Sequence, residues 1–350
     1  MKTIAVNTAK QYPVYIGTGI LSELGALTKS ITDGTAVIIS DSNVFPLYGS
    51  AAANCLRQAG ITVITYTFQA GETSKSIDTY FSILSFLASN NVTRSDVLIA
   101  LGGGVVGDIT GFAAATYLRG IPYVQVPTSL LAMVDSSVGG KTAIDLPAGK
   151  NLVGAFYQPS FVLCDVDVLS TLPTDIFRDG CAEVIKYGIL YDPRLFAHLA
   201  SSGFNFDRAS VIARCIELKR DVVTMDEFDT GERQKLNLGH TIGHSIEKES
   251  NFTVSHGQAV AIGTAIISRA AAVLNLCSKE TCNRICDVLT KFSLPITTQQ
   301  SADALFTGAL TDKKRSGGSI NLIIPIEIGN CMIRSTPITE LESIIEAGLQ

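Results

Sequence analysis

The chain has few charged residues for its length. They make up 17% of its 350 residues, against 46% for hydrophobic residues. This composition argues against extended disorder, because most of the chain must be buried, and it is typical of an ordinary globular enzyme. An excess of positive charge is also absent, since the formal net charge is −5. We therefore expect no nucleic-acid partner, although a local group of lysines could still bind a small anion.

Cysteine pairs with metal-binding spacing are absent too. The chain has 8 cysteines, but none of them forms a Cys-x-x-Cys pair. Cys282 and Cys286 lie four residues apart on a predicted helix and could touch a metal, yet no second pair accompanies them. In a reducing compartment these cysteines are most simply interpreted as small core residues.

Long hydrophobic runs of the targeting or membrane kind are also missing. Residues 1–8 contain no apolar segment of signal-peptide length, so a cytoplasmic location is expected. The longest apolar region, 259–276, contains Arg269 and many small residues. This pattern predicts a buried helix rather than a membrane span, and no membrane association is expected.

The first half of the chain alternates predicted strands and helices. Apolar, β-branched strands at 36–39, 61–64 and 96–101 are separated by helices at about 44–58 and 76–88. Fully apolar strands in this order are typical of a parallel sheet that helices cover on both faces.

After about Thr171 the predicted elements are mainly helices. Strand-like sequence returns only at 319–324, and Thr171-Leu172-Pro173 has the residues of a helix start. We therefore expect an α/β protein with a Rossmann-like parallel-sheet domain at 1–171 and a mainly α-helical domain at 172–350. The helices expected in the second domain are 176–188, 208–224, 259–274 and 279–292.

A glycine-rich segment follows the strand that ends at Leu101. Gly102–Asp108 has the Gly-x-Gly-x-x-Gly spacing and opens a predicted helix. Glycines here would let backbone N–H groups approach a phosphate at the positive end of a helix. The segment departs from the usual dinucleotide motif, because it follows a later strand and no acidic residue lies about twenty positions on. The alternative is a turn required only for tight packing.

A second glycine turn presents a lysine. Asp135–Thr142 reads DSSVGGKT, but it lacks the P-loop spacing, which argues against hydrolysis of nucleoside triphosphates. Further cations and a carboxamide lie in otherwise apolar sequence, where a plain solvated surface is a less natural interpretation. They are Lys150, Asn151, Lys186, Lys219, Arg233, Lys313 and Lys314.

Histidine is scarce and concentrated. Three of the 4 histidines are His240, His244 and His256, and on a helix the first two would share a face. With Glu183, His240 and His256 would make the mixed three-ligand set that catalytic zinc commonly uses. His244 could then transfer protons or orient substrate. The alternative is a pair of solvated histidines with a chance neighbour.

Taken in order, the motifs of this chain resemble those of the 3-dehydroquinate synthase family. The similarity extends from about Lys10 to Pro325. Single motifs are shared with other sugar-phosphate cyclases and, more loosely, with iron-dependent alcohol and glycerol dehydrogenases. The motifs are Gly102–Asp108, Ala114–Pro122, Gln125–Thr142, Gly149–Pro159, Ala182–Gly188, Leu236–Glu247 and His256–Gly263.

The resemblance implies an NAD cofactor on the first domain and one divalent metal ion, zinc or cobalt, on the second. The implied metal ligands are Glu183, His240 and His256. The implied NAD contacts are Glu72, Thr73, Ser74, Lys75, Gly104, Val105, Val106, Gly107, Asp108, Thr128, Ser129, Lys141, Lys150, Val168, Leu169, Ser170 and Thr171. The implied catalytic and substrate contacts are Arg119, Asp135, Lys141, Asn151, Lys186, Lys219, Arg233, Asn237 and His244. The choice between Lys313 and Lys314 stays open.

The implied reaction converts 3-deoxy-D-arabino-heptulosonate 7-phosphate to 3-dehydroquinate and phosphate, in the shikimate route to aromatic amino acids. Transient oxidation by NAD acidifies a C–H bond, phosphate leaves by elimination, the ketone is reduced again, and an aldol reaction closes the ring. The family also implies a homodimer, in which Arg119 often reaches the phosphate from the neighbouring subunit.

The departures from the family pattern are few. Ser129 replaces a frequent threonine, Asp145 and Leu146 replace a common Asn-His, and Ser255 and Gln258 flank His256 in place of Leu and Glu. None removes a ligand or charge that the chemistry needs.

Three other functions are weaker interpretations. A polyol or glycerol dehydrogenase would not need so many cations, because its substrate carries no anion. Cyclases of sedoheptulose 7-phosphate or glucose 6-phosphate act on substrates that lack the carboxylate. A non-catalytic metal-storage or scaffold protein would leave the glycine and lysine motifs unexplained.

Overall fold

The computed structural model describes residues 1–251, 253–310, 315–316 and 318–350. Lys313 and Lys314 lie outside these residues, so the structure does not bear on them. The chain folds into two compact units. One contains Met1–Pro173 and Arg208–Phe228, and the other contains Thr174–Asp207 and Asp229–Gln350. In the described part of the chain, no helix has the length and apolar character needed to cross a membrane.

The first unit is built on a sheet of seven strands in the order β1-β2-β9-β6-β5-β3-β4. Neighbouring strands are parallel except for β1 and β2, which confirms the predicted parallel-sheet fold. The strands are β1 (Lys2–Val6), β2 (Tyr12–Gly17), β3 (Thr35–Asp41), β4 (Thr62–Phe68), β5 (Val97–Gly102), β6 (Tyr123–Pro127) and β9 (Val162–Asp165).

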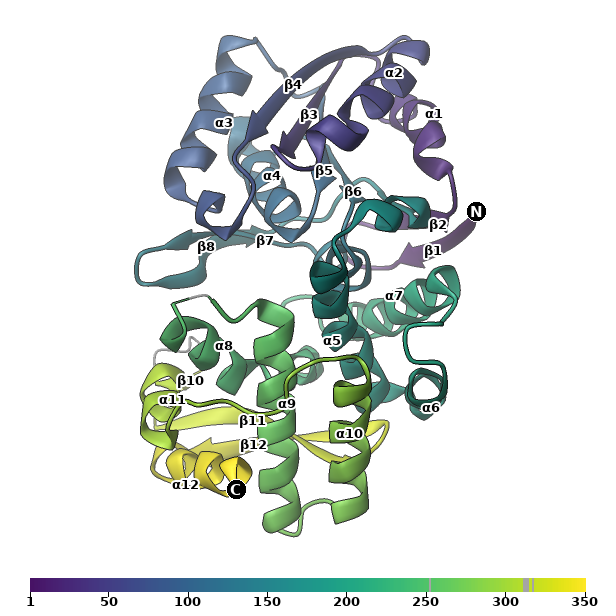
Figure 1. Ribbon diagram of the computed structural model, residues 1–350. Helices are drawn as coiled ribbons and strands as arrows, with labels where there is room; N and C mark the ends of the chain where they lie inside the picture. Colours follow the sequence, from purple (N-terminus) through teal and green to yellow (C-terminus); the bar gives the residue numbers. More distant parts are fainter. Residues whose placement is uncertain (252, 311–314, 317) are drawn as a thin grey trace. The chain divides into compact units, whose positions relative to one another are not determined.

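Helices cover both faces of this sheet, and Figure 1 shows them on opposite sides of the strands. Ala36 and Ile38 of β3 pack in a core with α1 (Leu24–Lys29) and α2 (Ser50–Gln58). Val37 and Ile39 point the other way and pack with α3 (Ile77–Ser89) and α4 (Gly104–Thr116). Because successive side chains alternate between faces, a strand covered on both sides is apolar throughout.

The strand order reverses between β3 and β5. From β3 the chain moves outward to β4, and then returns past β3 to form β5. The ends of β3 and β5 lie side by side, with Ser40 paired to Leu101. In open parallel sheets, ligands bind at the carboxyl ends of the strands at such a switch point. The glycine segment after β5 is therefore at the expected place for a cofactor.

A separate hairpin of β7 (Lys141–Leu146) and β8 (Gly149–Phe156) packs on α4. Gly139 and Gly140 have φ values of 97° and 69° in the turn that leads into it. This backbone conformation strongly favours glycine, which explains the glycine pair before Lys141. The sequence pattern did not predict this hairpin.

Helix α7 (Arg208–Met225) belongs to the first unit, whereas the predicted boundary at 171/172 placed it in the second domain. Glu217 of α7 pairs with Lys2 of β1 at 2.6 Å. Just beyond the helix, Glu227 accepts hydrogen bonds from the backbone N–H of Ala9 and from Gln158 Nε2, both at 2.9 Å. A helical pattern does not reveal which surface the helix packs on, and these contacts join residues distant in sequence.

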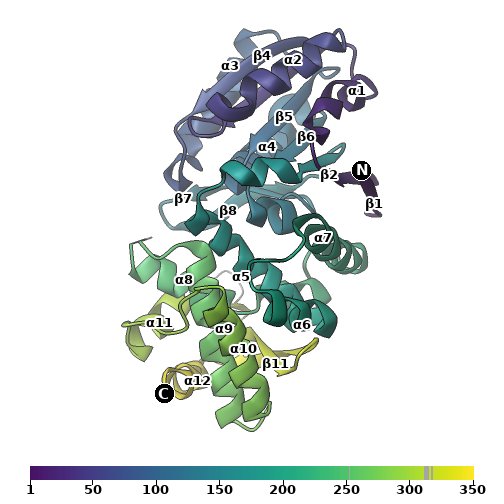
Figure 2. The same ribbon diagram turned by 45° about the vertical axis from the view of Figure 1, so that its right-hand side comes forward.

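The second unit is mainly helical, as predicted, and Figure 2 gives a second view of its helices. It also contains a three-stranded antiparallel sheet of β10 (Arg315–Ser316), β11 (Ser319–Glu327) and β12 (Asn330–Pro337). The helices are α5 (Thr174–Tyr191), α6 (Pro193–Ser202), α8 (His240–Glu249), α9 (His256–Val273), α10 (Lys279–Lys291), α11 (Ala302–Ala309) and α12 (Ile338–Leu349).

Helices α8 and α9 approach each other closely because glycines face the contact. A Cβ atom on Gly263 would lie 2.1 Å from the carbonyl oxygen of Gly239 and 2.9 Å from the backbone nitrogen of Gly243. The start of α9 is equally close to α5, since a Cβ on Gly257 would lie 2.3 Å from the carbonyl oxygen of Asp179. Tight packing at these points brings the starts of α8 and α9 toward α5.

Replacing Gly263 by alanine should lower the free energy of unfolding by at least about 2 kcal/mol, because backbone would have to move to admit the methyl group. Gly318→Ala is the matched control, since among the described residues, its chain neighbours apart, no atom lies within 4 Å of its added Cβ, and we expect a change within about 0.5 kcal/mol. Urea denaturation followed by circular dichroism measures both. Equal stability of the two variants would contradict the close helix contact.

Candidate active site

The glycine segment of the first unit forms the turn from β5 into α4. A Cβ on Gly102 would lie 2.5 Å from Val106, and one on Gly107 would lie 2.5 Å from Gln125 Oε1 of β6. Packing alone therefore explains these two glycines. A Cβ on Gly103 or Gly104 would meet atoms only at 3.5 and 3.3 Å. Gly103 caps α4 without any side-chain hydrogen bond, so the first backbone N–H groups of the helix are available in the manner of a phosphate site.

Lys75, Asp108 and Asn151 form a polar cluster beside this turn. Lys75 Nζ donates to Asp108 Oδ2 and to Asn151 Oδ1, both at 2.5 Å. The lysine is buried at 4% exposure. Burial by itself lowers the pKa of Lys75. Asp108 and the nearby carboxylates Glu72 and Asp145 raise that pKa by more than burial lowers it, so the ammonium stays charged.

Asp145, one of the departures from the family pattern, holds this cluster in place. Its Oδ1 accepts from the backbone N–H of Asn151 at 2.7 Å, and its own N–H donates to the carbonyl oxygen of Lys75 at 2.8 Å. Asn151 has φ 55°, a conformation that asparagine tolerates better than most residues. Lys150 Nζ lies 3.6 Å from Glu72 Oε1. The predicted NAD contacts from η3 (Glu72–Ser74) are thus connected to the β7–β8 hairpin.

Asp135 and Lys219, both predicted to contact substrate, are paired. Lys219 of α7 is buried at 5% exposure. Its Nζ contacts Asp135 Oδ1 and donates to the carbonyl oxygen of Asp135 at 2.5 Å. Asp135 lies in the helical turn η5 (Ala132–Ser136). Lys141 is exposed at the start of β7.

The turn η6 (Val166–Thr171) lies beside the segment that follows β3. Tyr48 donates its hydroxyl to the carbonyl oxygen of Val168 at 3.0 Å and lies 2.6 Å from Thr171 Oγ1. Thr128 is buried, and its backbone N–H donates to the carbonyl oxygen of Gly102 at 2.9 Å. These contacts hold η6 beside the segment that follows β3, and Thr128, directly after β6, beside the end of β5.

Sequence reasoning missed Asp41. This aspartate ends β3 at the switch point, and its Oδ1 accepts from the backbone N–H groups of Asn43 and Val44 at 2.8 and 2.9 Å. In the usual dinucleotide motif the acidic residue lies about twenty positions after the glycines, whereas Asp41 ends the strand beside β5 and precedes the glycines in the chain. The sequence feature that could have pointed to Asp41 is an acidic residue at the end of an otherwise apolar strand.

Arg119 stands apart from these residues. It is exposed in the turn η4 (Tyr117–Arg119), and Leu118, Arg119 and Gly120 have φ values of 50°, 67° and 119°. Non-glycine residues rarely adopt this conformation. No hydrogen bond or ion pair connects the Arg119 side chain to the described part of the chain.

Glu183 is the centre of the second unit's polar site. This α5 residue is 0% exposed, and Lys186, one turn later, is 2% exposed and contacts Glu183 Oε2. Neither carboxylate oxygen has a partner in hydrogen-bond geometry among the described residues, although the ammonium and two imidazoles lie close to them. A charged carboxylate in such a place requires compensation by cations or a metal ion.

His240 and His256 approach Glu183 from two other helices. Their Nε2 atoms lie 3.4 and 3.5 Å from Glu183 Oε1, and their ring centroids are 5.3 Å apart. His240 Nδ1 contacts the carbonyl oxygen of Leu238 at 3.0 Å, which directs Nε2 toward Glu183. Ser255, another departure from the family pattern, donates to Asp179 Oδ1 of α5 at 2.6 Å and so fixes the start of α9.

His256 lies between two buried carboxylates. Its Nδ1 is 3.5 Å from Glu247 Oε2, and Glu247 is 2% exposed on α8. Burial by itself lowers the pKa of His256, but Glu183 and Glu247 together raise it to about 10. Sequence reasoning missed Glu247, although it continues the helix face of His240 and His244 at the next turn.

Among the residues that the structure describes, two three-residue groups have ligand atoms close enough to hold a metal ion: Glu183 with His240 and His256, and His244 with Glu247 and His256. They share His256, and a neutral imidazole offers one unprotonated nitrogen. Only one group can therefore use that histidine at a time. The first group matches the predicted ligands. Glu183 favours it, because its carboxylate is fully buried and has no hydrogen-bond partner within the described residues. Its carboxylate and imidazole donors suit zinc or cobalt.

The remaining predicted residues of this unit lie on neighbouring elements. The His244 ring centroid is 5.5 Å from that of His240 and 6.4 Å from that of His256, and His244 is only partly buried. Arg233 is 1% exposed in η7 (Glu232–Asn237), and Asn237 Nδ2 donates to the carbonyl oxygen of Gln234 at 3.0 Å.

Solved structures of sugar-phosphate cyclases share this architecture. A 2-deoxy-scyllo-inosose synthase complexed with carbaglucose-6-phosphate, NAD+ and Co2+ is 26% identical, with a TM-score of 0.89 over 99% of this chain and 100% of that one. A 2-epi-5-epi-valiolone synthase from Streptomyces hygroscopicus with NAD+ and Zn2+ bound gives the same identity of 26% and TM-score of 0.89, over 99% of each chain. A glycerol dehydrogenase from Schizosaccharomyces pombe, 18% identical with a TM-score of 0.65 over 96% of this chain and 88% of that one, shares the fold.

Sequence comparison identifies the family. A model of the 3-dehydroquinate synthase N-terminal part matches residues 65–179, and one of the C-terminal part matches residues 180–315. A 3-dehydroquinate synthase from Clostridium kluyveri is 42% identical over 350 residues, 97% of each chain. One from Shewanella frigidimarina is 43% identical over 339 residues, 93% of each chain. This chain therefore belongs to the 3-dehydroquinate synthase family.

Proposed function

We propose that this chain converts 3-deoxy-D-arabino-heptulosonate 7-phosphate to 3-dehydroquinate and phosphate, as a phosphate-eliminating carbon–oxygen lyase of the shikimate route. The observation that carries the proposal is the fully buried Glu183 carboxylate, which Lys186 of the same helix and His240 and His256 of two other helices approach. This arrangement fits a divalent metal ion, zinc or cobalt, and family membership supplies the substrate.

NAD and the metal ion fit different units of the chain. Glu183, His240 and His256 would hold the metal, while the glycine turn before α4, the Lys75 cluster and η6 would hold NAD. When bound, NAD exchanges a hydride with a carbinol carbon of the substrate, and the metal polarises the hydroxyl on that carbon. The backbone N–H groups at the start of α4 would bind the NAD pyrophosphate.

Buried cations account for the recognition of an acidic sugar phosphate. Lys186, Lys219 and Arg233 are 2%, 5% and 1% exposed, and desolvated cations of this kind bind carboxylate and phosphate strongly. Lys219 is oriented by Asp135, and Lys186 by Glu183. The ion pairs hold both ammonium groups in fixed positions before substrate arrives.

His244 is suited to moving a proton. It lies one helical turn beyond His240 and is partly exposed, so its ring is placed beside the metal ligands without being required as one. A positioned imidazole can take the proton of the substrate hydroxyl and return it when the ketone is reduced again. Asn237 and Arg233, from the preceding turn, would orient the substrate.

A dehydrogenase or another cyclase is the alternative. The glycerol dehydrogenase shares the fold alone, and its name implies an uncharged substrate, which would leave the buried cations without a purpose. The two cyclases of known structure are 26% identical, against 42% for the Clostridium kluyveri relative. The substrate carboxylate distinguishes these functions, so an assay with and without it decides between them.

We also propose a homodimer in which Arg119 reaches the substrate phosphate of the neighbouring subunit. The exposed arginine, held in an unusual backbone conformation, supports this proposal. A cytoplasmic location and the absence of nucleic-acid partners remain predictions from the sequence.

The first prediction from the proposed function concerns substrate and cofactor balance. Purified protein with NAD and zinc or cobalt should release one phosphate per heptulosonate 7-phosphate, while absorbance at 340 nm stays near its baseline because each oxidation is reversed within the turnover. Sedoheptulose 7-phosphate should release phosphate much more slowly. Stoichiometric accumulation of NADH would support a dehydrogenase, and preference for the sedoheptulose ester would support another cyclase.

The second prediction separates the histidines. His240→Ala and His256→Ala should each lower metal occupancy and activity together. His244→Ala should keep near-stoichiometric metal but lower turnover by about two to four powers of ten, as expected for loss of a proton-transfer group. Elemental analysis of the purified variants measures occupancy. If His244→Ala loses its metal while His240→Ala keeps it, the ion is held by His244, Glu247 and His256 instead.

The third prediction assigns a positioning role to Glu247. Its carboxylate should accept the Nδ1 proton of His256 and direct Nε2 to the metal, so Glu247→Gln should weaken metal affinity by about 10- to 100-fold. Competition with a chelator measures affinity, and the visible spectrum of bound Co²⁺ reports whether the coordination geometry is retained. The control, Glu249→Gln, changes an exposed residue of the same helix. Equal affinities of the two variants would exclude this role.

A further inference from the structure

The first turn of α9 carries the metal ligand His256, and its N-cap serine is used in an unusual way. The side chain of an N-cap serine commonly accepts a hydrogen bond from one of the first backbone N–H groups of its own helix. Ser255 occupies this position. Among the described residues, its hydroxyl makes no capping bond to α9, and it donates instead to Asp179 Oδ1 of α5 at 2.6 Å. The start of α9 is therefore tied to another helix.

Asp179 and Glu183 lie on the same face of α5, because residues four apart on a helix are neighbours. Glu183 Oε1 is 3.5 Å from His256 Nε2, and Asp179 accepts its hydrogen bond from Ser255, the residue directly before His256. One face of α5 therefore contacts the start of α9 twice, once at the imidazole and once at the residue that precedes it.

Close backbone contact accompanies this hydrogen bond. A Cβ on Gly257 would lie 2.3 Å from the carbonyl oxygen of Asp179 and 2.4 Å from its Cα. Ser255 and Gly257, the two chain neighbours of His256, thus both meet Asp179. Since both neighbours are held against one residue of α5, the backbone of His256 has little freedom to move away from Glu183.

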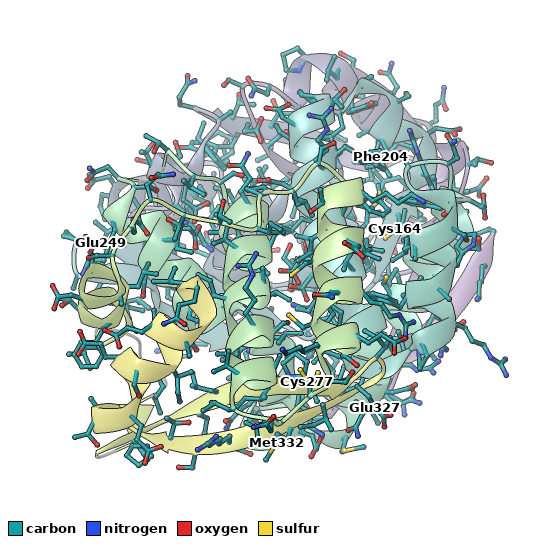
Figure 3. All side chains as sticks on the ribbon, turned by 60° about the horizontal axis from the view of Figure 1, so that its bottom comes forward. Cys164, Phe204, Glu249, Cys277, Glu327 and Met332 are labelled. Carbon is teal, nitrogen blue, oxygen red and sulfur yellow. The ribbon has the colours of Figure 1, made fainter. Side chains whose placement is uncertain are left out.

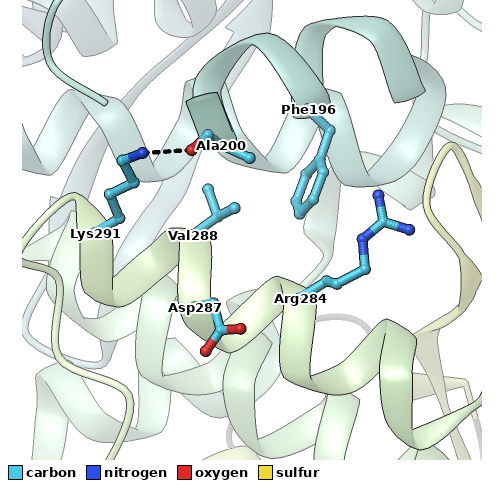
Figure 4. A pocket seen from close by; sticks show the side chains of 6 residues that line it. All are labelled: Phe196, Ala200, Arg284, Asp287, Val288 and Lys291. Carbon is cyan, nitrogen blue, oxygen red and sulfur yellow. Dashed lines mark hydrogen bonds between the residues drawn. The ribbon is translucent and has the colours of Figure 1, made fainter. Parts of the chain in front are cut away.

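Other contacts hold the rest of α9. The helix packs on α10 and α12, and the chain continues beyond its last turn to Cys277, which Figure 3 labels. Helix α10 is joined in turn to α6. Lys291 Nζ donates there to the carbonyl oxygen of Ala200 at 2.5 Å, beside the shallow pocket of Figure 4. Loss of the Asp179 contact should therefore affect the first turn of α9 rather than the whole helix.

Asp179 is not itself placed to bind the ion. Within the described residues, neither of the two groups whose ligand atoms could share a metal ion includes Asp179. An effect of this residue on the ion must therefore pass through His256.

We propose that Asp179 is a positioning residue of the metal site. Through its hydrogen bond with Ser255, it fixes His256 where this histidine and Glu183 can bind one ion. The inference rests on the proposed function, because it takes Glu183 and His256 as metal ligands. Ser255 replaces a frequent leucine of the family pattern, and a leucine side chain cannot donate a hydrogen bond. The contact is therefore one that the common pattern cannot form.

The test measures the affinity of the intact protein for Co²⁺ by competition with a chelator and records the visible spectrum of the bound ion. Asp179→Ala should weaken binding by about tenfold, the lower end of the range for residues that orient metal ligands. The spectrum should change as well, because His256 is displaced. Asp179→Asn keeps an acceptor oxygen and should retain the affinity within about threefold. The control, Asp175→Ala, changes an exposed residue one turn earlier on α5 and should leave the affinity unchanged.

Ser255 provides a second and milder variant. Ser255→Ala should weaken Co²⁺ binding about as much as Asp179→Ala, whereas Ser255→Thr keeps the hydroxyl and should retain most of the affinity. The double alanine variant should bind no more weakly than either single variant, because each substitution removes the same hydrogen bond.

A purely structural role of Asp179 gives a different result. The alanine variants would then have a lower free energy of unfolding without metal, but the same Co²⁺ affinity as the unchanged protein, and this result would overturn the proposal. Additive effects of the two alanine substitutions on affinity would overturn it too. If the unchanged protein bound no Co²⁺, the proposed function itself would be wrong, which the measurement reveals before any variant is compared.

Discussion

The second unit depends on one buried charge. Glu183 is completely inaccessible to solvent, and an isolated carboxylate there would cost several kcal/mol. The surrounding helices reduce this cost by placing Lys186 and two imidazoles around it, which explains why α5, α8 and α9 must meet at their present positions. The glycines at the α8–α9 and α5–α9 contacts allow the same approach, because larger residues there would keep His240 and His256 away from Glu183. Packing and chemistry therefore constrain the same positions.

In the first unit, backbone N–H groups and cations lie together at one edge of a sheet. The reversal of strand order places the ends of β3 and β5 side by side. Hydrogen bonds join Lys75 to Asp108 of α4 and to the β7–β8 hairpin, and Ile144 of the hairpin packs in one apolar core with Ile109 and Phe112 of α4. Asp145 contributes to that hairpin with its carboxylate, so a departure from the family pattern has become part of the support of Lys75.

Much of this could be predicted from local pattern. The apolar strands at 36–39 and 96–101 indicated a sheet covered on both sides, and the spacing of His240 and His244 indicated one helix face. Tertiary partners were not predictable in the same way. Nothing in the amphipathic pattern of 208–224 reveals that this helix packs beside β1, and nothing around Glu247 reveals that its carboxylate meets His256. Asp41 was missed because the acidic residue beside the glycine turn comes earlier in the chain than the usual motif suggests.

The position of α7 in the chain has a consequence for how the protein is made. The chain leaves the first unit at Pro173, returns with Arg208, and leaves again after Phe228. A ribosome therefore begins the second unit before it has finished the first. Until residues 208–228 have emerged, the nascent sheet lacks the helix that pairs Lys219 with Asp135 and Glu217 with Lys2. No single cut in the chain yields both units whole, because each unit consists of two separate chain segments. The two units therefore cannot be synthesised one after the other.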